Sequence, residues 1–142
     1  MKHVIWSYKN AEKILDQNQL KNEIIDIIEL IEPAEATHKH IQNKFQESGW
    51  ILEKYIFEEV RWAWDAFKDN IAISIEFSLI DAIQRDLLRA ILAKKQGKLG
   101  VLVFILDLVI SEPQFENVQK QVKIFSPILD YPILLIGIDR RS

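Results

Sequence analysis

The sequence predicts an α/β fold of the α+β type, in which a central mixed β-sheet is flanked by helices. Two nearly continuous aliphatic runs, residues 100–106 and 133–138, are typical of strands that helices cover on both faces. Residues 62–77 alternate around a short turn, as a β-hairpin does. Residues 19–32 and 82–96 instead place apolar side chains at helical spacing.

The first part of the chain is expected to be helical. In residues 19–32 the apolar side chains form one stripe, Asn18 precedes them as a candidate N-cap, and Pro33 follows the end. A second helix is expected over residues 35–46, because Gly49 suits the position after a helix C-terminus.

The second part of the chain is expected to alternate strands and helices. In chain order we predict strands over residues 50–57, 62–67 and 71–77, a helix over 82–96, a strand over 100–106, a helix over 115–125 and a strand over 133–138. This order indicates one mixed sheet, and the length of 142 residues fits a single domain, residues 1–142.

Composition excludes several classes of site. The chain is 49% hydrophobic and 27% charged, as expected for a globular protein. It has no cysteine, so disulfides, thiolate zinc sites and cysteine nucleophiles are excluded. No apolar run reaches the length of a membrane span, and the first residues lack the apolar region of a signal peptide. We therefore expect a soluble, cytoplasmic protein that does not enter a membrane.

The net charge of −3 argues against binding nucleic acid through an overall positive field. A nuclease with an acidic metal centre would need a local basic rim instead. The side chains available for such a rim are Lys39, Lys44, Lys54, Arg61, Lys68, Arg85, Arg89, Lys94, Lys95 and Lys98.

Asp65 and Glu76 lie on the two arms of the hairpin. Strand alternation places Glu76 on the same face as Ser74, opposite a face of isoleucines, and folding about Asp69 brings Asp65 level with Ser74. Carboxylate oxygens are the ligands that Mg²⁺ prefers, so this pair could hold one ion. The same alternation predicts that three side chains of the first arm share the face opposite Asp65, namely Trp62, Trp64 and Ala66.

Plainer interpretations of these acids remain. Asp65 and Glu76 could be solvated side chains on an open sheet face, with Lys68 or Arg85 as partners. A different register would pair Asp69 with Glu76, although an aspartate in a turn is the simpler explanation.

The histidines do not form a metal-binding motif. His38 and His40 are two residues apart on a predicted helix and therefore point in different directions. We expect both at the surface. No glycine-rich phosphate loop or catalytic serine motif occurs either.

Several segments, rather than a single motif, resemble one known family. They are residues 8–15 near the start, 65–68 and 73–78 in the hairpin, 85–88 in the following helix, and 100–103 and 132–137 in the last two strands. In these segments the chain resembles the BglII and BstYI branch of type II restriction endonucleases, in the PD-(D/E)XK nuclease superfamily. The resemblance implies a restriction-endonuclease-like core and a homodimer that hydrolyses phosphodiester bonds of duplex DNA with Mg²⁺, or alternatively Mn²⁺.

The resemblance also assigns roles within and after the hairpin. Asp65 matches the family's first metal-binding aspartate and Glu76 matches its third active-site position, so both are expected to bind the metal. Ser74 stands at the second position, normally glutamate, and is expected to position a water ligand. Lys68, counted with the catalytic residues, and Arg85 are expected to contact the nucleic acid and neutralise phosphate charge.

Ser74 leaves three explanations open. Glu76 reaches back to the ion, a carboxylate comes from a neighbouring helix, or the site is inactive. The acids on neighbouring helices are Glu23, Asp81 and Asp86. An inactive site would make the chain a catalytically degenerate nuclease fold that serves as a DNA-binding or regulatory module.

Overall fold

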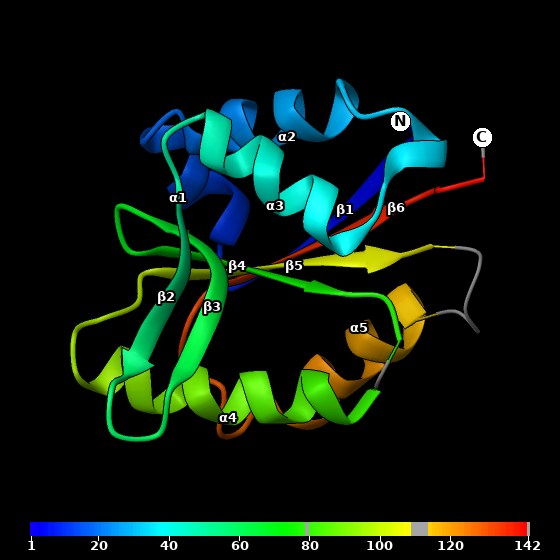
Figure 1. Cartoon of the computed structure of the whole chain (residues 1–142). Coiled ribbons are helices and arrows are strands. Elements are labelled where there is room, and N and C mark those ends of the chain that lie inside the picture. Colours follow the sequence, from blue (N-terminus) through cyan, green and yellow to red (C-terminus); the bar gives the residue numbers. More distant parts are fainter. Residues whose placement is uncertain (79, 109–113, 142) are drawn as a thin grey trace.

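A computed structural model describes residues 1–78, 80–108 and 114–141, in which a six-stranded sheet lies between two layers of helices (Figure 1). In chain order the elements are β1 (His3–Tyr8), α1 (Ala11–Gln17), α2 (Leu20–Glu29), a 3₁₀ turn (Pro33–Glu35), α3 (His38–Glu47), β2 (Ile51–Phe57), β3 (Trp62–Lys68), β4 (Ile71–Glu76), α4 (Ile80–Lys95), β5 (Val101–Asp107), α5 (Gln114–Ile124) and β6 (Ile133–Ile138). Among these helices, none is long and apolar enough to span a membrane.

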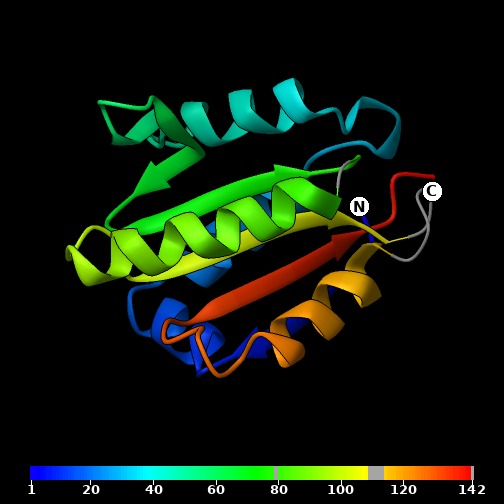
Figure 2. The ribbon, with the colours of Figure 1, turned by 90° about the horizontal axis from the view of Figure 1, so that it is seen from below.

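The sheet is mixed, as predicted. Its strand order is β1-β6-β5-β4-β3-β2, with β4, β5 and β6 parallel to one another and the remaining neighbours antiparallel. Helices α1, α2 and α3 cover one face, and α4 and α5 cover the other (Figure 2). All residues of β5 and β6 are buried, which confirms that the two aliphatic runs are strands covered on both faces.

Strand alternation divides the interior into two cores. In β4, Ile73 packs into the core beneath α1, α2 and α3, whereas Ala72 packs into the core against α4 and α5. Val103 and Phe104 of β5 separate in the same way. Because apolar side chains cover both faces of the central strands, a polar site can form only at the strand ends or on the hairpin side of the sheet.

The hairpin turn has the predicted position. Asp69 and Asn70 both have positive φ, 50° and 64°, which is the backbone of a type I′ turn and matches the twist of the flanking strands. Ala66 pairs with Ile73, and the same register continued by one residue puts Asp65 beside Ser74. Asp69 is therefore an exposed turn residue, and the alternative register is wrong.

The predicted faces of the first arm are correct for Trp62 and Trp64, which pack with the same core, and wrong for Ala66. Trp64 packs into the core beside α4, but Ala66 packs into the core beneath α2 and α3. The reason is that β3 pairs with β4 only over residues 66–68 and then bends away with β2 toward α4 (Figure 1). Strict alternation holds only while the strand stays in a regular sheet.

The beginning of the chain differs from the prediction. Strand β1 and helix α1 were not predicted, because β1 is a half-exposed edge strand without clear alternation and α1 has only seven residues. Asn18 ends α1 rather than capping α2, whose N-cap position is Gln19 at φ 62°.

Arg140 ties three parts of the chain together. Its Nε and Nη2 donate to Oδ2 of the fully buried Asp107, at 3.2 and 2.9 Å, and its Nη1 donates to the carbonyl of Ala36 at 3.0 Å. The guanidinium also lies 4.0 Å from the ring centroid of Phe77. These contacts fix the loop before α3 against the carboxyl ends of β4 and β5.

We expect Arg140→Met to lower the free energy of unfolding by about 2 to 4 kcal/mol, because a buried carboxylate loses its guanidinium contacts. Urea denaturation at pH 7 measures the change. Arg141→Met is the matched control, since Arg141 is an exposed arginine next in the chain. Equal effects of the two substitutions would show that this clamp does not stabilise the fold.

Candidate active site

Asp65 lies where β3 leaves the sheet, and two contacts hold its carboxylate. Its Oδ2 accepts a hydrogen bond of 2.6 Å from the main-chain N–H of Ile75, and its Oδ1 lies 3.1 Å from Nε2 of His38. The side chain is only 18% exposed. The Asp65 carboxylate thus accepts a hydrogen bond from a main-chain N–H of β4 that lies beyond the last regular pair of β3 and β4. This bond holds the carboxylate in the gap where the two strands separate.

Helix α3 supplies the other side of this gap. The hydroxyl of Thr37 accepts from the N–H of His40 at 3.2 Å and caps the helix, so that His38 stands at its first turn. Gln42 follows His38 by one turn on the same face. Its Nε2 donates to the carbonyl of Asp65 at 3.0 Å and to Oε1 of Glu53 at 2.9 Å. Two successive turns of α3 therefore contact Asp65.

A carboxylate from α4 occupies the space beside Ser74. The Ser74 hydroxyl donates to Oδ2 of Asp86 at 2.5 Å, and Asp86 is only 8% exposed. Oδ1 of Asp86 lies 3.8 Å from the Arg89 guanidinium, one turn along α4. The strand thus presents a hydroxyl, and the neighbouring helix presents the acid.

Glu76, the last residue of β4, completes a crowded acidic group. Burial, together with the negative charges of Asp86 and Asp65, raises the pKa of Glu76 to about 7, although His38 and Arg85 oppose the shift. Burial also raises the pKa of Asp86 to about 6, against the lowering effects of the Ser74 hydrogen bond and of Arg89. These acids therefore lie close enough to disfavour one another's ionisation.

The hydrogen bond to Asp65 raises the pKa of His38 above its usual range, with smaller contributions from the charges of Glu76 and Glu53. The His38 side chain is 47% exposed. The raised pKa favours the protonated, positively charged form of the imidazole, which lies at the edge of the acidic cluster and is accessible to solvent.

The structure brings Asp65, Ser74, Glu76 and Arg85 together but leaves Lys68 apart. The Lys68 ammonium donates to Glu23 of α2 at 2.9 Å and lies over the Trp50 ring. Three residues along a strand separate Lys68 from Asp65 by about 10 Å. This position does not support a catalytic role for Lys68, whose ammonium instead pairs with Glu23 away from Asp65.

Sequence reasoning missed His38 as a site residue and did not single out Gln42. Their spacing of four residues on one predicted helix was a usable signal, because it places two polar side chains on one face. The expectation that both histidines lie at the surface is incomplete, since His38 contacts Asp65 whereas His40 lies 3.6 Å from Glu35. Asp81 is exposed, so Asp86 is the helical acid that reaches Ser74.

The donor set suits a divalent ion in its chemistry. Carboxylates from β3, β4 and α4 supply hard oxygen donors, and the raised pKa values show that a positive charge among them would be favourable. Within residues 1–78, 80–108 and 114–141, no three acidic or histidine side chains already stand close enough to share an ion. Binding would therefore require these side chains to move closer together.

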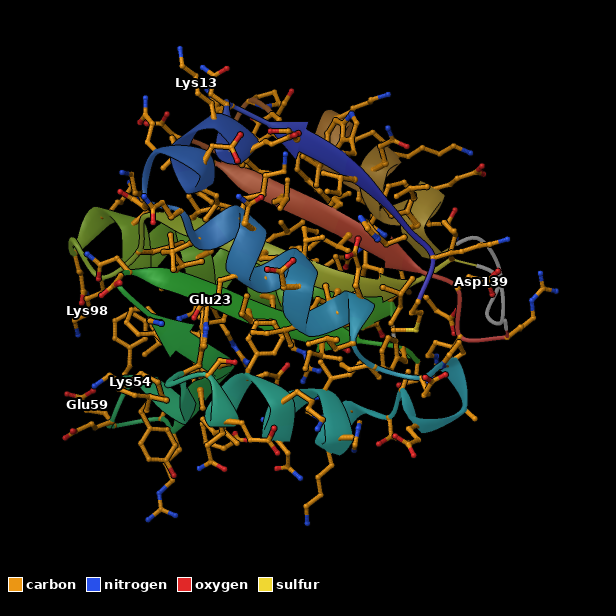
Figure 3. The ribbon with its side chains drawn as sticks, turned by 90° about the horizontal axis from the view of Figure 1, so that it is seen from above. Lys13, Glu23, Lys54, Glu59, Lys98 and Asp139 are labelled. Carbon is orange, nitrogen blue, oxygen red and sulfur yellow. The ribbon has the colours of Figure 1, made fainter. Side chains whose placement is uncertain are left out.

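Basic side chains also gather at the other end of the hairpin. Lys54 and Lys98 line a cavity of about 470 Å³, with Glu59 at the same end of the molecule (Figure 3). Lys98 lies 5.2 Å from the ring centroid of Phe57. On α4, the Arg89 guanidinium lies 4.7 Å from the Trp62 ring.

The mixed sheet between two helical layers is the fold of a restriction endonuclease. It matches the crystal structure of restriction endonuclease BglII complexed with a DNA 16-mer at a TM-score of 0.82 and 20% sequence identity, over 96% of this chain and 78% of that chain. Residues 3–138 match the family model of restriction endonuclease BglII/BglIII. The chain therefore belongs to the BglII/BglIII restriction endonuclease family. No curated protein sequence matches it.

The crowded acids predict an unusual dependence of stability on pH. Asp86 has a higher pKa in the folded chain than its ordinary value of 3.8, so it costs stability as the pH rises from 3.8 to about 6, and Glu76 does the same between 4.5 and about 7. We expect Asp86→Asn to stabilise the metal-free protein by about 1 kcal/mol at pH 8. The gain should vanish near pH 4.

Urea denaturation in EDTA across this pH range measures the effect, with Asp81→Asn as the exposed control on the same helix. Glu76→Gln should shift stability in the same direction as Asp86→Asn. A loss of stability at pH 8 in both variants would mean that the acids are favourably paired rather than crowded.

Proposed function

We propose that the chain is a divalent-metal-dependent DNA endonuclease that hydrolyses phosphodiester bonds of duplex DNA. Membership of the BglII/BglIII family supports the reaction class. The observation that carries the proposal is the convergence of acids from β3, β4 and α4 in the gap where the hairpin leaves the sheet. Mg²⁺, or alternatively Mn²⁺, is the cation such oxygen donors suit.

Three acids would hold the ion. Asp65 and Glu76 contribute from the hairpin, and Asp86 supplies the carboxylate that family members carry on the strand. Ser74 then acts as a positioning residue, because its hydroxyl donates to Asp86 and directs that carboxylate. Of the explanations for Ser74, this favours a carboxylate from a neighbouring helix. A divalent ion bound there would polarise the scissile phosphate and lower the pKa of its water ligand.

Arg85 would neutralise the phosphate of the substrate. It is exposed, one residue before Asp86, and its charge lowers the pKa of both Glu76 and Asp86. A solvent-facing guanidinium beside the acids can contact a phosphate without leaving another partner buried. Lys68 would first have to release Glu23.

Cleavage of supercoiled plasmid with Mg²⁺ or Mn²⁺ tests the proposal. We expect Asp65→Ala to lower the rate at least about 100-fold, and Ser74→Ala to lower it about tenfold, because the first removes a ligand and the second only the group that positions one. Asp69→Ala, in the exposed turn, is the control. Absence of cleavage by the native chain with either ion would favour the catalytically degenerate module.

An exchange of residues tests the origin of the third acid. Asp86→Ser should abolish cleavage, and adding Ser74→Glu should restore a substantial part of it, because the acid then returns to the strand. Asp81→Ser should have no effect. Full activity of Asp86→Ser alone would exclude Asp86 from the centre and leave Glu76 as the substitute ligand.

We also propose that the active form is a homodimer that buries the outer side of the α4 and α5 layer. Leu88 and Leu92 on α4 are 57% and 46% exposed, and Ile124 and Ile128 are 72% and 53% exposed. Leu88 and Ile128 line a common pocket, and exposed apolar side chains that lie together indicate an interaction surface. This layer faces the viewer in Figure 2.

Light scattering after size-exclusion chromatography measures the oligomeric state. We expect the combined change Leu88→Glu and Ile128→Glu to convert a dimer into a monomer, because it places charges within a buried apolar contact. Leu30→Glu is the control, since Leu30 is 81% exposed at the end of α2 on the other side of the sheet. A monomeric native chain would refute the proposed dimer.

A further inference from the structure

We propose that His38 is a further ligand of the metal centre and that its imidazole makes the site prefer Mn²⁺ or Co²⁺ to Mg²⁺. The inference rests on the proposed metal dependence, but it concerns which ion the site selects. It assigns a specificity-determining role to a side chain of α3, outside the hairpin.

The spacing of His38 and Asp65 is that of neighbouring ligands on one ion. Donor atoms about 2.1 Å from a metal and at right angles to one another lie about 3.0 Å apart. Nε2 of His38 and Oδ1 of Asp65 are separated by 3.1 Å. An ion could therefore bind both atoms with little movement of either side chain.

The surroundings of the imidazole also suit a ligand. The negative charges of Asp65, Glu76 and Glu53 raise the pKa of His38, so acids of β3, β4 and β2 lie near enough to act on the imidazole. The side chain is 47% exposed, which leaves it accessible to an ion from solvent. Nε2 is the atom that points to Asp65, and imidazole Nε2 is a common metal ligand.

The position of His38 is fixed by contacts on both sides of it in the chain. Before it, the carbonyl of Ala36 accepts from Arg140 and the hydroxyl of Thr37 caps the helix. After it, Gln42 is 7% exposed and donates to the main chain of Asp65. These contacts keep the helix turn that carries the imidazole next to the Asp65 carboxylate, as a preorganised ligand requires.

An imidazole changes which ion is bound most tightly. Mg²⁺ prefers oxygen donors and keeps several waters, whereas Mn²⁺ and Co²⁺ accept nitrogen as well as oxygen, and Co²⁺ binds more strongly than Mn²⁺ at such sites. A site made of carboxylates alone would give no such advantage over Mg²⁺. A nitrogen donor beside Asp65 therefore favours the transition ions.

Electron spin echo modulation of Mn²⁺ bound to the EDTA-dialysed protein tests the proposal directly, because it detects a coordinated nitrogen. We expect ¹⁴N modulation in the native chain, its loss in His38→Asn, and its persistence in His40→Asn, the control on the same helix. Isothermal titration should show Mn²⁺ affinity falling at least about tenfold in His38→Asn, with Mg²⁺ affinity changing much less.

Bound Mn²⁺ without ¹⁴N modulation in the native chain would overturn the inference and leave His38 as a residue that only orients Asp65. Failure of Mn²⁺ to bind would overturn it too. The native spectrum does not depend on how any variant folds. A nitrogen signal without plasmid cleavage would separate the two proposals, because the ligand assignment would stand while the nuclease activity failed.

Discussion

The carboxylate of Asp65 is the group on which the local architecture depends. By accepting from Ile75 N–H, it replaces a strand-to-strand contact and lets the hairpin leave the sheet. The gap that results is lined by β4 and closed by α3, whose Gln42 binds the main chain of the same aspartate. Without that side-chain acceptor, β3 could continue its pairing with β4, and the gap would not form.

The contact between Ser74 and Asp86 places a helical carboxylate beside the central strand β4. A hydroxyl on the strand leaves room for a carboxylate from α4, which is held at 2.5 Å in a buried position. The acid, Asp86, belongs to α4, so its position depends on how this helix packs against β4. Asp86 thus brings a negative charge next to the strand position that Ser74 occupies.

The local pattern of the sequence was sufficient for the hairpin register, because a two-residue turn and alternation leave little freedom. Alternation along the hairpin singled out Asp65 and Glu76, and the resemblance assigned their metal-binding roles. Neither could predict that His38 reaches Asp65, because that contact depends on how α3 packs against β3, nor which of three helical acids meets Ser74. Trp64 and Ala66 lie in different cores for the same reason, because tertiary packing bends β3 between them.

The crowding of acids has a consequence for folding as well as for chemistry. Burial and mutual repulsion raise the pKa of Glu76 and Asp86, so the metal-free chain pays for holding them together at neutral pH. An ion that binds only the folded chain reverses this cost, because it supplies the missing positive charge and adds its binding free energy to stability. The same repulsion that weakens the free protein would therefore favour a bound cation, and metal binding would then stabilise the fold.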